Sequence, residues 1–363
     1  MKVLFLITRG DELGGAQTHV KDVILGLINK YNIECYLACG TKGIFTDIME
    51  ENNINVIHID SMKREICFGD IIALKKLNDI IKDINPDIIS CHSSKAGVLG
   101  RLASLGTRTK KVFTAHGWAF TEGISPKKAA IYKKIELLLS YITDATINVS
   151  YYDKKLALKA GLKSQHYVIH NCIPDVHYEK NNGIANKTVL EFIMVVRFCA
   201  QKDHETLLKA FSNIDKEKWR LTLIGGGDSK SIKELAKKLN IDNNINFVGQ
   251  TKNVVDFLNH SDVFLLISNW EGFPISILEA MRSSLPIIAT DVGGVSEAVK
   301  HGYNGFLINK GNVAELEETI IKIIESYSSL KILSQNSRKT YCERFKVDKM
   351  IDLYASIFDE VLK

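Results

Sequence analysis

The sequence lacks any apolar run near the roughly twenty residues that a membrane-spanning helix needs. The apolar stretch at its start, residues 3–7, is too short for the core of a secretory signal and leads directly into polar residues 8–11. We therefore expect residues 3–7 to form the first strand of a sheet. Any membrane contact should be peripheral.

The seven cysteines lack the spacing of a disulfide framework or of a zinc site. They are odd in number and scattered over positions 35, 39, 67, 91, 172, 199 and 342, with no C-x-x-C pair. The simplest interpretation is reduced, buried thiols in a cytoplasmic protein. A peripheral place on the inner face of the cell membrane is left open.

Length and charge indicate two domains with different surfaces. A chain of 363 residues exceeds what one core usually serves. Residues 1–170 carry 23 basic and 17 acidic side chains, a net charge of +6, and the remainder carries 24 and 25, a net charge of −1. The basic half suits an anionic partner such as a membrane surface or a lipid-linked phosphate. A merely solvated basic face is an equal alternative, and no nucleic-acid partner is expected.

Short apolar runs alternate with helical patterns along the chain, which is typical of α/β proteins with doubly wound parallel sheets. Residues 171–175 and the polar stretch 179–187 indicate a linker. We expect domains at 1–170 and 171–345, with a C-terminal helix in 346–363 packed back on the first. Strands are predicted at 3–7, 34–38, 56–59, 88–91, 111–115, 145–149, 190–196, 221–225, 245–248, 263–267, 286–290 and 305–308, and helices at 18–30, 46–51, 71–84, 96–105, 126–142 and 349–362.

Two glutamates eight positions apart, Glu271 and Glu279, flank a predicted helix start. Pro274 suits a first helical turn because its missing N–H would be unpaired there, so the helix is expected to begin near Phe273 or Pro274. Free amides between two carboxylates suit a polyhydroxylated ligand that carries phosphate. This segment resembles the E-x7-E motif of the family 4 retaining glycosyltransferases. That resemblance implies the GT-B architecture, with two Rossmann-like domains facing across a cleft.

A glycine pair after the first predicted strand supports the resemblance. Gly14 and Gly15 would let backbone amides approach a phosphate just before a helix. A tight turn without a ligand fits this pair equally well. The family more often has glutamate where Gln17 stands, so no chemistry is assigned to Gln17.

A pair of cations after a strand of the second half also matches the family. Arg197 and Lys202 have the spacing of its Arg-x4-Lys pattern, and together they could neutralise a departing nucleotide diphosphate without a metal. No D-x-D sequence occurs in the chain, so the usual metal-binding signature of the other major glycosyltransferase architecture is absent. We therefore expect no metal and no cofactor other than the nucleotide-sugar donor.

Two further segments lie at predicted strand ends. The resemblance implies that His116 contacts the transferred sugar, and whether it acts as a base or only positions the sugar is left open. The glycine-rich turn around Gly226 fails as a Rossmann fingerprint because Lys230 stands where the last glycine should be. The resemblance places this turn beside the nucleotide.

The resemblance also divides the roles within the glutamate segment. It implies that Glu279 holds both ribose hydroxyls, since one carboxylate can accept two hydrogen bonds from a vicinal diol. Glu271 should contact the sugar. Amides near Phe273, Pro274 and Ile275 should hold the sugar and pyrophosphate, although Pro274 itself cannot donate.

Acceptor binding is expected in the basic N-terminal domain. Lys63 and Arg64 precede the apolar residues 66–68, and four lysines at 127, 128, 133 and 134 lie among the apolar residues of the helix predicted at 126–142. Basic residues beside exposed apolar ones suit an anionic bilayer and a polyprenyl-diphosphate acceptor. The alternative is an amphipathic helix with its lysines in water.

Taken together, the resemblance implies a metal-independent retaining glycosyltransferase. It would move a hexose or N-acetylhexosamine from a nucleotide sugar, expected to be UDP-linked, to a glycan or polyprenyl-diphosphate acceptor in surface polysaccharide synthesis. The alternative from another class is a non-catalytic sugar-nucleotide-binding or scaffolding subunit of the same fold. A sugar-nucleotide epimerase of similar architecture fits the E-x7-E segment poorly.

Overall fold

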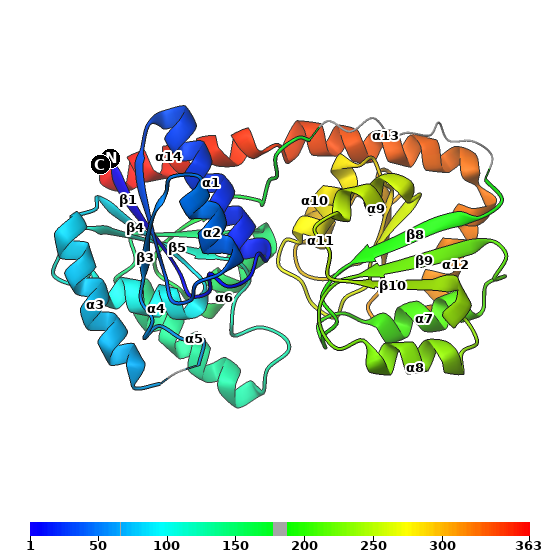
Figure 1. Cartoon of the computed structure of the whole chain (residues 1–363), viewed down its shortest axis with the longest axis horizontal. Coiled ribbons are helices and arrows are strands. Elements are labelled where there is room, and N and C mark those ends of the chain that lie inside the picture. The colour runs from blue at the N-terminus through cyan, green and yellow to red at the C-terminus, as the bar shows by residue number, and fades with distance from the viewer. Residues whose placement is uncertain (66, 177–186) are drawn as a thin grey trace. The chain divides into compact units, whose positions relative to one another are not determined.

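The computed structural model describes residues 1–65, 67–176 and 187–363, which form two compact units (Figure 1). The first unit contains Met1–Pro174 and Val347–Lys363, and the second contains Asp175–Lys346. Each unit is a parallel sheet covered by helices, so the predicted α/β class of two Rossmann-like domains is confirmed. Part of the predicted linker, residues 179–186, lies outside the described residues.

The first unit is built on a seven-stranded sheet whose described strand pairs are all parallel. Its strands are nearly continuous runs of apolar residues because helices cover both faces of the sheet. The strand order is β3-β2-β1-β4-β5-β6-β7. The strands are β1 (Lys2–Ile7), β2 (Glu34–Cys39), β3 (Asn55–His58), β4 (Ile88–His92), β5 (Lys110–Ala115), β6 (Ala145–Asn148) and β7 (Gln165–Val168).

Helices pack on this sheet through apolar side chains at helical spacing. A core cluster joins Leu4 and Leu6 of β1 to Ala73 and Leu77 of α3 and to Leu99 of α4. Phe5, which alternates with these residues along β1, instead meets Phe358 of α14. The helices are α1 (Gly15–Tyr31), α2 (Ile44–Glu51), α3 (Gly69–Ile84), α4 (Ser94–Ala103), α5 (Pro126–Ser140), α6 (Tyr151–Ala160) and α14 (Val347–Leu362).

The C-terminal helix α14 lies beside α1 in the first unit, where Figure 1 also places both chain ends. Close packing is possible because position 26 is glycine: a Cβ there would come within 2.4 Å of Ile351 Cγ1. At the surface, Lys30 Nζ pairs with Asp352 Oδ1 at 2.5 Å. In the interior, the hydroxyl of Tyr354 reaches His19. The last helix is therefore tied to the first by both apolar and polar contacts.

The second unit has a six-stranded parallel sheet of order β10-β9-β8-β11-β12-β13. Its core contains Phe192 and Met194 of β8 packed with Leu207 and Phe211 of α7 and Leu316 of α12. The strands are β8 (Leu190–Val195), β9 (Trp219–Ile224), β10 (Ile245–Gly249), β11 (Val263–Leu266), β12 (Ile287–Thr290) and β13 (Gly305–Ile308).

Helices α7 and α8 lie on one side of this sheet in Figure 1, and α9 and α10 lie on the other. Packing of α7 with α12 and of α10 with α13 completes the two layers. The helices are α7 (His204–Ser212), α8 (Lys230–Lys238), α9 (Val254–His260), α10 (Ile275–Arg282), α11 (Val295–Ala298), α12 (Val313–Glu325) and α13 (Tyr327–Arg344).

Strand order reverses once in each sheet, between β1 and β4 and between β8 and β11. The chain leaves the two strands at such a point in opposite directions, so their following loops diverge. Ligands of open parallel sheets bind at this position, outside the carboxyl ends of the strands. The two reversals therefore indicate where to look for functional side chains.

Candidate functional site

The loops that follow β8 and β11 bring Lys202 and Glu271 together at the strand-order reversal of the second sheet. Backbone bonds fix the two loops to each other: Asp203 N–H donates to Ile267 O at 2.9 Å, and Asn269 N–H donates to Gln201 O at 2.7 Å. Lys202 Nζ then contacts Glu271 Oε1.

Both oxygens of the Glu271 carboxylate have partners among its neighbours. Besides Lys202, it accepts a hydrogen bond from Ser268 Oγ at 2.7 Å and one from Gln201 Nε2 at 3.1 Å. The side chains of Lys202 and Glu271 are 10% and 6% exposed. A buried ion pair is tolerated when further hydrogen bonds satisfy its remaining oxygens, as they do here. The arrangement fixes one cationic and one anionic side chain next to each other at the edge of the second sheet.

Arg197 stands at the same edge, on the loop after β8, and is exposed. The glycine-rich turn after β9 supports this loop: Phe198 N–H donates to Gly226 O at 2.8 Å. Gly225 has φ 155°, and a Cβ there would lie 1.7 Å from Val196 O. Only glycine allows this approach of two backbones. The glycine-rich turn and the loop that carries Arg197 are thus held together by backbone contacts.

A second glycine contact supports Glu271 from behind. Gly293 has φ 61°, and a Cβ there would lie 1.8 Å from the carbonyl oxygen of Glu271. The next residue, Gly294, donates its N–H to Gly272 O at 2.8 Å. The segment after β12 therefore holds the Glu271 loop in place. We did not single out this Gly-Gly pair from the sequence, although its place after an apolar run was a usable signal.

Helix α10 begins at Ile275, and Pro274 precedes it as the cap residue with an extended backbone. The observed start is thus within one or two residues of the start predicted near Phe273 or Pro274, although Pro274 is the cap residue and not part of the first turn. Phe273 is buried and packs near Phe345, with ring centroids 5.6 Å apart, so packing as well as helix preference sets the start. The backbone amides of the first turn of α10 come directly after Pro274 in the sequence.

Glu279 lies in the second turn of α10 and is partly buried. Burial raises the pKa of its carboxyl group above the ordinary value, and the nearby Arg282 opposes that shift. A carboxylate held away from water in this way gains from hydrogen-bond donors supplied by a ligand.

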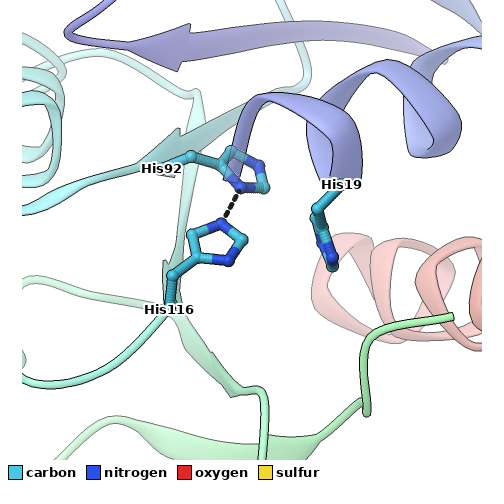
Figure 2. A group of neighbouring side chains, drawn as sticks. All are labelled: His19, His92 and His116. Carbon is cyan, nitrogen blue, oxygen red and sulfur yellow. Dashed lines mark hydrogen bonds between the residues drawn. The ribbon is translucent and has the colours of Figure 1, made fainter. Parts of the chain in front are cut away.

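In the first unit, His116 belongs to a group of three histidines (Figure 2). His92 ends β4, His116 follows β5, and His19 lies on α1. His92 Nδ1 and His116 Nε2 are 3.1 Å apart and share a hydrogen bond. The rings of His19 and His116 meet edge to face, with centroids 4.8 Å apart.

His19 is anchored by two other partners. Its Nδ1 lies 2.9 Å from Asn171 Oδ1, and its Nε2 lies 2.7 Å from the hydroxyl of Tyr354. Since the amide oxygen accepts, His19 Nδ1 carries the proton and Nε2 accepts from Tyr354. The Tyr354 hydroxyl in turn lies 3.0 Å from Thr114 Oγ1, at the end of β5.

All three histidines are held neutral. Burial lowers the pKa of His19 to about 4. Burial also lowers the pKa values of His92 and His116 well below the ordinary range, and the neighbouring histidines lower them further. Protonation of one ring would place a positive charge away from water and beside the other two imidazoles, so it is unfavourable for any of the three.

The predicted glycine pair opens α1. Gly14 is the cap residue of that helix and Gly15 its first residue. Gln17, to which we assigned no chemistry, is buried and donates from Nε2 to Arg9 O at 3.2 Å. Its contact is with the backbone of the preceding loop, which is a structural function.

Comparison with known proteins identifies both halves of the chain. Residues 13–176 match the family described as Glycosyltransferase Family 4, and residues 175–340 match Glycosyl transferases group 1. The two matches follow each other along almost the whole sequence. The chain is a glycosyltransferase.

Relatives of this glycosyltransferase include enzymes named for O-antigen biosynthesis. The O-antigen biosynthesis glycosyltransferase WbnH of Escherichia coli is 29% identical over 329 residues, which is 90% of this chain and 91% of the relative. A UDP-Gal:alpha-D-GlcNAc-diphosphoundecaprenol alpha-1,3-galactosyltransferase of the same species is 28% identical and covers 90% of each chain. The crystal structure of Anabaena Alr3699/HepE in complex with UDP and glucose has a TM-score of 0.84 at 22% identity, with 99% of each chain covered. That likeness confirms the GT-B fold.

Sequence reasoning missed several members of these groups in the glycosyltransferase. His19 and His92 were not singled out, although His92, like His116, follows an apolar run that reads as a strand. The expectation that all the cysteines are buried was wrong for Cys67 and Cys199, which are exposed. Both lie in loops outside the apolar strands.

The basic surface predicted on the first unit is exposed on α5. Lys127, Lys128, Lys133 and Lys134 all reach solvent, and the apolar Ile131 and Leu138 are 56% and 62% exposed. Phe68, which precedes α3, is 92% exposed, whereas the neighbouring Ile66 lies outside the described residues. Among the helices that the structure describes, none has the length and apolarity to cross a membrane.

The neutral histidines predict a loss of stability in mild acid. An unfolded chain takes up protons below about pH 6.5 that folded His19 refuses until about pH 4, so the free energy of unfolding should be unaffected above pH 6.5 and fall below it. The slope is about 1.4 kcal/mol per pH unit for each such histidine. Urea unfolding between pH 7.5 and 5 measures it.

His19→Gln should flatten this slope, whatever its effect on stability at pH 7.5. The matched control is His260→Gln, because His260 is exposed. A wild-type slope that His19→Gln leaves unchanged would contradict the burial of a neutral imidazole at this position.

Proposed function

We propose that the glycosyltransferase moves a hexose or N-acetylhexosamine, with retention and without a metal, from a UDP-sugar to a glycan or polyprenyl-diphosphate-linked acceptor in surface polysaccharide synthesis. The observation that carries the proposal is the contact of Lys202 with Glu271 beside Arg197 at the reversal of the second sheet. The predicted diphosphate-side and sugar-side residues meet there. The name of the Escherichia coli galactosyltransferase supports the UDP-sugar donor and the polyprenyl-diphosphate acceptor, and the name of WbnH supports a role in O-antigen synthesis.

Donor binding is assigned to the second unit. Arg197 and Lys202 would neutralise the diphosphate, the first-turn amides of α10 would bind its oxygens, and the turn at Gly226 would border the nucleotide. Glu279 would accept hydrogen bonds from both ribose hydroxyls, which its partly buried carboxylate favours.

In the second unit, sugar recognition is assigned to Glu271. In the first unit, His116 is assigned a contact with a sugar, and Gly14 and Gly15 would offer the amides that open α1 to a phosphate. Because Glu271 already holds Lys202, a sugar hydroxyl that bonds to Glu271 would lie close to the cation that binds the phosphate. The residue pair thereby orients the bond that breaks, the one between the anomeric carbon and the phosphate oxygen.

The reaction we propose needs no protein nucleophile. The anomeric carbon–oxygen bond breaks toward an oxocarbenium-like state, the acceptor oxygen attacks from the same face, and the β-phosphate oxygen takes the acceptor proton. The products are the glycoside, with its configuration kept, and the nucleoside diphosphate. Stabilisation of the departing charge by Arg197, Lys202 and the helix amides is the main contribution of the protein.

A turnover assay tests this assignment. UDP release should appear with one member of a panel of nucleotide sugars, rise when a lipid-linked acceptor is present, and persist in EDTA. Arg197→Ala and Lys202→Ala should each lose most of the turnover, because one charge on the diphosphate is then unmatched.

Lys209→Ala is the matched control, since Lys209 is an exposed lysine that pairs with Glu205 across one helical turn. Unchanged rates in the Arg197 and Lys202 variants would reject the phosphate assignment. No release with any donor would favour the non-catalytic binding subunit, and activity that EDTA abolishes and Mg²⁺ or Mn²⁺ restores would reject metal independence. An inverted anomeric signal in the product would reject retention.

The two glutamates should separate in kinetics. Glu279→Gln should mainly weaken donor binding, because an amide offers one acceptor oxygen where the ribose diol needs a carboxylate. Glu271→Gln should mainly slow transfer. Donor affinity by calorimetry and the maximal rate by assay measure the two effects independently.

Glu271→Gln also leaves Lys202 without its ionic partner, so a thermal unfolding measurement must accompany it. A variant that remains folded at the assay temperature and transfers at the wild-type rate would overturn the sugar-side role. The reverse pattern, with affinity lost in Glu271→Gln and rate lost in Glu279→Gln, would exchange the two assignments.

We also propose peripheral binding of the first unit to an anionic membrane, at the cytoplasmic face, where a polyprenyl acceptor would be held. The support is the exposed set of lysines on α5 together with exposed apolar side chains on the same helix. Lysines would attract the lipid phosphates, and the apolar side chains would enter the interface.

Liposome flotation tests this surface. Wild-type protein should float with vesicles that contain anionic lipid and not with neutral vesicles, and reversal of the four α5 lysines to glutamate should abolish flotation. Reversal of four exposed lysines on α8 (Lys230, Lys233, Lys237 and Lys238) makes the same change in net charge elsewhere and should have less effect. If the charge-reversal variants of α5 and α8 floated equally well, the proposed membrane contact through α5 would be rejected.

A further inference from the structure

Ser90 and His92 of β4 and His116, which follows β5, form a hydrogen-bonded row of three side chains. Ser90 Oγ lies 3.1 Å from His92 Nε2, and His92 Nδ1 lies 3.1 Å from His116 Nε2. Ser90 and His92 are fully buried, whereas His116 is partly exposed. Figure 2 shows the second of these bonds joining the two imidazoles directly. The row therefore connects the interior of the sheet to its functional edge.

The hydroxyl group of Ser90 determines which nitrogen atoms of the row carry protons. In the part of the chain that the structure describes, its hydroxyl has one partner, His92 Nε2. If that nitrogen donated to Ser90, the serine proton would be buried without an acceptor. An orphaned buried donor is rarer and more costly than an acceptor with an unused lone pair. Ser90 therefore donates, and His92 Nε2 accepts.

The remaining protons follow from neutrality. A neutral His92 that accepts at Nε2 must carry its proton at Nδ1, and it donates that proton to His116 Nε2. His116 is also neutral, so its own proton lies on Nδ1. No hydrogen bond within the described residues involves His116 Nδ1, which leaves that N–H for a ligand.

We propose that Ser90 and His92 are positioning residues that fix His116 in the Nδ1–H tautomer, so that His116 serves the reaction as a hydrogen-bond donor to a sugar oxygen and not as a base. This inference rests on the proposed sugar contact of His116. With Nε2 occupied by His92 and Nδ1 protonated, neither nitrogen offers a lone pair to an acceptor proton. The proton must then leave by another route, which agrees with its transfer to the β-phosphate oxygen.

A metal ion held by the three histidines is the competing interpretation. One nitrogen from each of His19, His92 and His116 lies within 4.8 Å of the others. Both nitrogens of His19 are, however, bonded to Asn171 and Tyr354, and both of His92 are bonded to Ser90 and His116. A cation would have to break at least two of these four bonds, one at His19 and one at His92, so the hydrogen-bonded row explains the geometry better.

Nitrogen NMR on histidine-labelled protein reads the tautomer without reference to activity. In the wild-type chain, the signals of His116 should show a protonated Nδ1 and a bare Nε2. Ser90→Ala removes the donor that orders the row, so His116 should become a mixture of tautomers. His92→Phe keeps a ring beside Phe5, whose centroid is 5.8 Å from that of His92, and should remove the preference entirely.

Transfer rates supply the functional arm. His92→Phe should lower the maximal rate about tenfold, the worth of one hydrogen bond, with donor affinity unchanged. His92→Asn should restore part of the rate, because its amide can still donate to His116. His260→Gln should match the wild type in both arms, since His260 is exposed and distant in sequence.

The outcomes separate the two ideas. A wild-type His116 with its proton on Nε2 would overturn the inference and leave the sugar assignment standing. The expected tautomer together with normal transfer by His116→Ala would overturn the sugar assignment and the role as donor. Zn²⁺ that shifts the nitrogen signals of all three histidines at stoichiometric concentration would replace the row by a metal site.

Discussion

The reversal of strand order between β8 and β11 is the constraint on which the donor side of the structure depends. Neighbouring parallel strands normally send their chains the same way, and the loops after them cover the sheet edge. At the reversal the loops diverge, so side chains just beyond each strand stay accessible to a ligand. Lys202 follows β8 and Glu271 follows β11, and their contact is a direct consequence of this topology. The equivalent point of the first sheet brings Thr8 beyond β1 to Ser93 beyond β4, with their hydroxyls 2.8 Å apart.

Much of this topology could be predicted from the sequence because strands buried on both faces are apolar throughout. All the predicted apolar runs became strands within a residue or two. Strand β7 was missed because it lies at the sheet edge and its sequence, QHYV, is mostly polar and partly exposed. Helix α6 was missed because lysines interrupt its apolar pattern, although Ser150 caps it by accepting from Asp153 N–H. Edge strands and exposed helices are therefore not predicted from apolar patterns, because those patterns reflect burial.

The candidate site was predictable only where one residue carries the signal. Arg197, Lys202 and Glu271 follow apolar runs of the second sheet, and His116 follows one of the first. Parallel topology alone brings such residues to one edge of their own sheet. The row of Ser90, His92 and His116 depends instead on the register between β4 and β5, which pairs His92 with Thr114. No local pattern contains that register. The same holds for Gly293, whose need to be glycine arises from a backbone more than twenty residues away.

The two units bury polar groups in opposite ways, and the difference bears on the chemistry. The second unit pairs the ammonium group of Lys202 with Glu271, whereas the first keeps three imidazoles neutral by burial, which lowers their pKa values. A cation is needed where a diphosphate departs, because its charge grows as the bond breaks. A second cation beside the sugar would oppose the positive charge that develops on an oxocarbenium-like carbon. A neutral His116 can donate a hydrogen bond to the sugar without adding such a charge, so its lowered pKa serves the proposed reaction as directly as the ion pair does.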